Sequence, residues 1–143
     1  MWSKRKKQKI ERIDTLIGVD TRIIGDVHFK GGFHLDGSIK GNVDAVVDSK
    51  SILSVSDSGV VEGSVAVPYV ILNGVIKGDI IAHERIELGG TARVEGNVYY
   101  GLIEMEIGAE INGKLVHESA DKRKQSLQAA PQAQPEGAPP VDQ

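Results

Sequence analysis

A three-residue unit, glycine followed by a small polar or charged residue and then an aliphatic one, recurs six times along the chain. Its glycines stand at positions 25, 41, 63, 78, 96 and 113, so the step between units averages about 17.6 residues. In most units an aliphatic residue stands two positions before the glycine, as Ile39 does before Gly41. A repeat of this length is typical of stacked architectures, in which each unit buries its apolar side against its neighbours.

The spacing within the repeat indicates strands joined by corners. Alternating aliphatic and polar residues give strands with one face inward, and glycine at a fixed position allows the chain to turn there. About 18 residues make three short sides, which form one triangular coil of a β-solenoid. We therefore predict an all-β fold of about six triangular coils over residues 15–117, stacked into a rod roughly 30 Å long. The 22-residue step between Gly41 and Gly63 predicts a small insertion around residues 45–51.

Composition supports strands and excludes several classes of protein. Residues 15–117 contain 13 Ile and 15 Val, a β-branched bias that favours a sheet over a helical bundle. The absence of cysteine excludes a disulfide scaffold, a thiolate zinc site and a cysteine nucleophile. No apolar run approaches the roughly 20 residues of a membrane span, and no cleavable signal follows the basic N-terminus. We expect a cytoplasmic protein.

Charge divides the chain into three regions. Residues 1–14 carry six basic and two acidic side chains, whereas residues 15–117 carry eight basic and fourteen acidic ones. An acidic body is a poor nucleic-acid binder, so we expect no nucleic-acid partner. Residues 118–143 hold four of the five prolines in a Gln/Ala-rich run, which predicts a disordered tail. The expected organisation is a flexible basic arm (1–14), a β-helix domain (15–117) and a tail (118–143).

No arrangement of side chains indicates catalysis. The four histidines, at irregular spacings, form no ligand pair on one strand, so we expect neither a metal nor a cofactor, and neutral roles for His28, His34, His83 and His117. A polar cluster near a turn is interpreted as loop chemistry: Ser51, Ser54, Ser56 and Ser58. The early glycines fit no phosphate-binding spacing. The alternative that stays open is a left-handed hexapeptide-type acyltransferase or a related trimeric enzyme.

The ends of the predicted solenoid are the surfaces most suited to association with another copy. A solenoid end exposes unpaired backbone groups and an open apolar core, which soluble solenoids usually cover with a cap. Here the last coil, residues 107–116, stays apolar to its end. We therefore predict end-to-end self-assembly that needs no nucleotide. The candidate contact residues are Leu16, Ile17, Ile107, Ile111 and Leu115.

The ordered glycine pattern resembles that of the bactofilins. The resemblance rests on residues 15–18, 23–27, 31–32 and 36–43 and on the later glycine units, and it covers residues 15–117. It implies a right-handed β-helix that polymerises without nucleotide into non-polar cytoskeletal filaments. It also implies a scaffold for cell shape that recruits cell-wall enzymes. The family commonly has Phe at the position of Ile111, so this chain offers a smaller apolar plug there.

The N-terminal arm combines one aromatic residue with a basic cluster, and it resembles the membrane-targeting peptide of many bactofilins. Trp favours the bilayer interface, and each nearby Lys or Arg adds ~1 kcal/mol of attraction to anionic lipid. We predict that the arm holds the protein at the inner face of the cell membrane. The residues concerned are Met1, Trp2, Ser3, Lys4, Arg5, Lys6 and Lys7.

Overall fold

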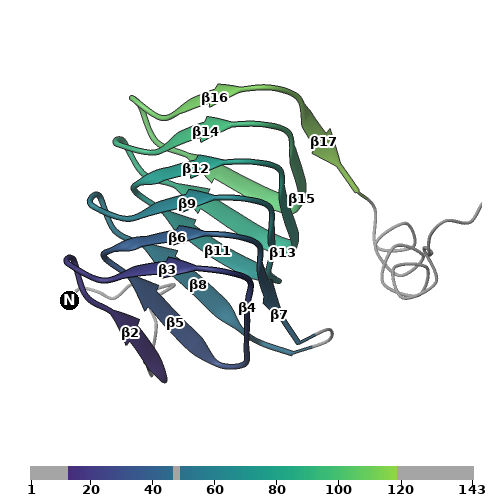
Figure 1. The fold of residues 1–143 in the computed structure, drawn as a ribbon. Coiled ribbons are helices and arrows are strands. Elements are labelled where there is room, and N and C mark those ends of the chain that lie inside the picture. The colour runs from purple at the N-terminus through teal and green to yellow at the C-terminus, as the bar shows by residue number, and fades with distance from the viewer. Residues whose placement is uncertain (1–12, 47–48, 119–143) are drawn as a thin grey trace, which may run out of the picture.

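The computed structural model describes residues 13–46 and 49–118, which form a parallel β-solenoid of six coils (Figure 1). The chain rises from the purple N-terminal coil to the green C-terminal coil, with right-handed winding. These residues contain no helix. The predicted all-β solenoid is confirmed, and its hand does not fit the left-handed acyltransferase kept as an alternative.

Each coil contributes one strand to each of three faces, here named A, B and C. Face A contains β2 (Thr15–Ile17), β5 (Gly32–Leu35), β8 (Ile52–Val55), β11 (Tyr69–Leu72) and the second halves of β13 (Ile80–Leu88) and β15 (Val98–Met105). Face B contains β3 (Arg22–Ile24), β6 (Ser38–Lys40), β9 (Val60–Glu62), β12 (Val75–Lys77), β14 (Arg93–Glu95) and β16 (Glu110–Asn112). Face C contains β4 (Val27–Phe29), β7 (Val43–Ala45), β10 (Val65–Ala66), the first halves of β13 and β15, and β17 (Leu115–His117).

Parallel pairing in register stacks equivalent side chains into columns. On face A, for example, Phe33 pairs with Leu53 and Leu53 with Val70, and all three side chains are buried. Because side chains alternate along a strand, each such inward column lies beside an outward one. The core thus consists of stacked layers of mainly aliphatic side chains, one layer per coil. It is closed in the middle coils, whereas Ile17 and Ile111 at the two ends are only partly buried.

The repeated glycines form the corner between faces B and C, where successive coils touch through their backbones. A Cβ on Gly41 would lie 2.1 Å from the carbonyl oxygen of Gly25, so no other residue fits. The Asp or Asn that follows four of these glycines links its coil to the next one by accepting a backbone hydrogen bond. The backbone N–H of Asn42 donates to Asp26 Oδ1 at 2.9 Å, and that of Ser64 donates to Asn42 Oδ1 at 3.0 Å. The glycine–polar unit is therefore a stacking device.

The predicted insertion is confirmed between faces C and A. Strand β7 ends at Ala45 and β8 begins at Ile52, whereas β13 runs through the same corner without a break. Serine side chains hold the inserted segment in place through hydrogen bonds. The backbone N–H of Gly31 donates to Ser51 Oγ at 3.0 Å, and Ser51 Oγ lies 2.7 Å from Ser49 Oγ. Part of the predicted serine cluster therefore supports a turn, as expected.

Candidate assembly surfaces

Exposed large apolar side chains gather at the two ends of the solenoid. The described residues include nine of them, and eight belong to the first or the last coil. The ninth, Val46, belongs to the insertion. The N-terminal group is Ile13, Leu16, Val19 and Ile24, and the C-terminal group is Leu102, Met105, Ile107 and Leu115. Exposed apolar side chains are thus concentrated in the two terminal coils, partly on the end faces and partly on the side walls beside them.

The N-terminal end presents the unfinished core of the first coil. Ile17, Ile23 and Phe29 point inward and pack on the core, but they are only partly buried. The Phe29 ring packs against that of Phe33 in the next coil, with the ring centroids 4.9 Å apart and the planes tilted by 49°. Leu16 differs, because it pairs with His34 in an outward column and is 59% exposed. Leu16 therefore lies on the side wall beside the end.

The C-terminal end is more open. Met105 continues the inward column of Leu88, and it is 45% exposed because no coil follows. Ile111 stacks on the buried Val94 and is partly covered. Ile107 occupies the tip of the corner between faces A and B and is wholly exposed. Within the described chain, β16 pairs only with β14 and β17 only with β15, so both leave one backbone edge unpaired.

The predicted contact residues therefore separate into three positions. Ile17, Ile111 and Leu115 belong to inward columns at the ends, Leu16 lies on the side wall, and Ile107 lies at a corner. Their role in a junction stays a prediction. Met105 was not predicted, because its inward position becomes visible only from its register with Leu88. The predicted membrane-binding residues 1–7 lie outside the described residues.

A polar cluster on face A joins the second and third coils. His34 Nε2 lies 3.0 Å from Asp36 Oδ1, and His34 Nδ1 lies 3.3 Å from Ser54 Oγ. A hydrogen bond from Ser56 is the largest cause that lowers the pKa of Asp36; desolvation opposes it and the attraction of His34 adds to it. Sequence reasoning treated the histidine and the serines separately. The one-coil separation of His34 and Ser54 is the signal that could have joined them.

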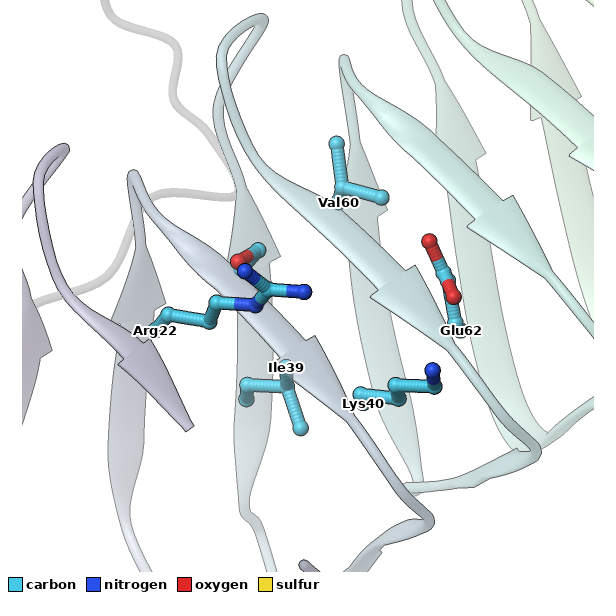
Figure 2. Close-up of a pocket in the computed structure, with 6 residues that line it drawn as sticks. Arg22, Ile39, Lys40, Val60 and Glu62 are labelled. Carbon is cyan, nitrogen blue, oxygen red and sulfur yellow. The ribbon is translucent and has the colours of Figure 1, made fainter. Parts of the chain in front are cut away.

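The side walls carry charge in ordered columns. On face A, Arg85 forms ion pairs with Glu87 at 2.9 Å and with Glu104 at 2.7 Å. A shallow pocket of about 260 Å³ lies on face B. Figure 2 shows the side chains of mixed charge that line it on β3, β6 and β9. Residues 13–46 and 49–118 hold no group of three metal-ligating side chains and no helix able to cross a bilayer. The residues that line the pocket on face B are Arg22, Ser38, Ile39, Lys40, Val60 and Glu62.

These features define a class of protein: a β-solenoid whose open core and unpaired edges face outward at both ends, suited to self-association. A family model described as bactofilin, polymer-forming cytoskeletal, matches residues 15–116. The chain therefore belongs to the bactofilin family, and the resemblance noted in its sequence is confirmed.

Individual relatives agree with this assignment. Bactofilin BacO of Myxococcus xanthus (strain DK1622) is 29% identical over 102 residues, which are 71% of this chain and 78% of BacO. Bactofilin BacP of the same organism is 32% identical over 80 residues, which are 56% of this chain but only 33% of BacP. A cryo-EM reconstruction of Thermus thermophilus bactofilin double helical filaments has a TM-score of 0.63 and 30% identity. That match covers 73% of this chain and 99% of the other.

Proposed function

We propose that this chain is a bacterial cytoskeletal scaffold that stacks end to end into filaments without nucleotide. The observation that carries the proposal is the open core at the two solenoid ends, where inward columns of apolar side chains have no further coil of the described chain to cover them. The terminal members of these columns are Ile17, Met105, Ile111 and Leu115. Burying them between copies removes apolar surface from water, which favours association by roughly 25 cal/mol per Å². Within the described residues the terminal strands of both ends leave one edge unpaired, and such edges add backbone hydrogen bonds to the contact.

The positions of the glycines support the proposed independence from nucleotide. Phosphate-binding loops need glycines that are free to wrap around a phosphate ahead of a helix. In this solenoid the corner glycines are stacked on one another instead, as Gly63 is on Gly41 with a carbonyl 2.1 Å from where a Cβ would stand. The glycine-rich character of the chain is thus used for stacking.

The filament is proposed to be non-polar, with like ends meeting. Both ends carry apolar side chains, so each can bury itself against the same end of another copy through a twofold contact. The T. thermophilus relative forms double helical filaments. We infer that filaments of this chain also pair side by side.

The location proposed for the filament is the inner face of the cytoplasmic membrane. The basic arm, with Trp2 and residues 4–7, precedes the first coil, so a filament would present one arm per subunit. Each arm binds weakly, and repetition along the filament raises the overall affinity. At the membrane the filament would organise cell-wall (peptidoglycan) enzymes and so influence cell shape. Glu118, the first residue of the predicted tail, is buried and its backbone N–H donates to the carbonyl of Tyr100 at 2.9 Å, whereas residues 119–143 lie outside the described residues.

Electron microscopy of the purified full chain tests the proposal. Long unbranched filaments should form in buffer without nucleotide, and added nucleotide should leave their length unchanged. A monodisperse species under all conditions would overturn the proposal. Light scattering across a concentration series gives an independent measure, since end-to-end assembly by apolar contacts becomes more extensive as the protein concentration rises.

A further inference from the structure

One outward column on face C is apolar over four successive coils. Val65, Ile80 and Val98 point inward and have no exposed surface, so the residue after each points outward. The register aligns these outward residues from coil to coil, and each of them is half-buried. The column, which we call the face C stripe, consists of Ala66, Ile81, Tyr99 and Val116.

The other two faces carry charges in the same coils. Face A has the ion-paired Arg85, Glu87 and Glu104 on its outer side. Face B carries Lys77 and Glu95 in one outward column. Residues 15–117 hold fourteen acidic and eight basic side chains, so two copies that approach sideways repel each other. The column of outward residues on face C carries no charged side chain in these four coils, so contact there avoids both this repulsion and the cost of desolvating ions.

We propose that the face C stripe is the surface through which a second filament of the same chain pairs with the first. This inference rests on the proposed function, because the stripe of one subunit spans only three strand spacings, about 14 Å. A contact of that length is far smaller than a stable dimer interface, which buries about 1,200 Å² or more. End-to-end stacking repeats the stripe along the filament, so that many weak contacts act together.

The chain itself shows how the stripe can be altered without disturbing the fold. Asp44 occupies the same outward column in the second coil, where it pairs in register with Ala66. A carboxylate at this position is therefore compatible with the solenoid. The test variant is Ile81→Asp with Tyr99→Asp, which extends the charge of Asp44 along the stripe. The matched control is Val60→Asp with Val75→Asp, two adjacent outward positions on face B.

The measurement is the mass per unit length of filaments, read by scanning transmission electron microscopy of full-length protein. Wild type and the face B control should give two-stranded filaments. The stripe variant should give single-stranded filaments with half the mass per length, of similar contour length. Circular dichroism should show unchanged strand content. If the Asp variant does not fold, Ile81→Thr with Tyr99→Thr replaces it, because Thr suits a strand and still removes apolar area.

Each outcome decides the inference. Two-stranded filaments from a folded stripe variant would overturn it, as would single-stranded filaments from wild type. A stripe variant that remains two-stranded but loses binding to vesicles of anionic lipid would assign the stripe to a membrane instead. Loss of pairing in the face B control as well would also overturn the inference, because added charge would then prevent filament pairing whichever face carries it. Absence of wild-type filaments would refute the proposed function itself, which is a separate result.

Discussion

Leu115 stacks directly on Val98 in the same inward column, yet Leu115 is 46% exposed and Val98 is completely buried. Val98 is stacked between Ile80 and Leu115, whereas within the described residues Leu115 has a stacked neighbour on one side only. A further coil would bury Leu115 as Leu115 buries Val98. The end of the solenoid is thus an unfinished repeat, and a second copy can complete it.

Ile111→Arg should prevent filament growth. Ile111 lies in the middle of β16 and stacks on Val94, so a charge there would be enclosed in a junction without a partner. An uncompensated buried charge costs about 3–5 kcal/mol, so the critical concentration for assembly should rise by more than about a hundredfold. Sedimentation should find short soluble species, and circular dichroism should retain its strand signal.

The control for this variant is Asn112→Arg, which adds the same charge at the neighbouring exposed position. It should still form filaments. If Ile111→Arg unfolds the monomer, Leu115→Arg takes its place, because Leu115 is more exposed. Filaments of normal length from both Ile111→Arg and Leu115→Arg would show that the C-terminal end is not a junction.

Gly41→Ala should destabilise the solenoid, because the added Cβ would lie 2.1 Å from the carbonyl oxygen of Gly25. Backbone on both sides leaves little room to relax, so the loss is on the order of 1–3 kcal/mol. Gly18→Ala is the matched control, since its Cβ would meet nothing within 4 Å. Thermal unfolding of the two variants should separate them, and equal midpoints would contradict the backbone stacking.

Asp36 should make stability depend on pH in the acid range. Its pKa is lowered from the ordinary 3.8, chiefly by the hydrogen bond from Ser56. A carboxylate whose pKa is lower in the folded state stabilises the fold above its unfolded pKa, and this contribution is lost as the pH falls through the folded value. Asp36→Asn should therefore be less stable than wild type at pH 6, with a difference that shrinks below about pH 3.8. A pH-independent difference would contradict this role.

Replacing His28, His34, His83 and His117 together by Gln should preserve polymerisation. Gln keeps a hydrogen-bonding side chain at His34, and the described residues contain no metal-ligating group that the change would disrupt. A chelator should likewise leave filaments and the melting temperature unchanged. Dissolution of filaments by chelator would reveal a metal requirement.

Binding to anionic liposomes should require both parts of the arm. Trp2→Ala removes the inserted ring, and charge reversal of Lys4, Arg5, Lys6 and Lys7 removes the attraction. Each change should reduce co-sedimentation, and salt should weaken wild-type binding, because attraction is screened beyond ~8 Å at physiological ionic strength. Filaments should form normally in both variants. Equal binding by wild type and by a chain lacking residues 1–9 would refute the membrane role.

Much of the fold could be predicted because the close backbone contact between successive coils requires glycine, and glycine is visible in the sequence. A corner that stacks glycine on glycine, as at Gly25 and Gly41, admits no substitute, so its period counts the coils directly. The insertion followed from the same count. The side that each residue faces was harder to predict. A strand shifted by one residue exchanges its inward and outward positions, so Leu16 and Met105 could be assigned only from the observed register.

The contacts at the polar corner imply where a filament breaks. Side-chain oxygens link successive coils within a subunit, as when Asn97 Oδ1 accepts from the backbone N–H of Lys114 at 3.0 Å. Lys114 has no side-chain oxygen to offer to a further coil, so this link stops at the last repeat. A junction between subunits must hold without it. Under shear or tension, fracture should occur between whole subunits, and the fragments should keep intact ends that can anneal again.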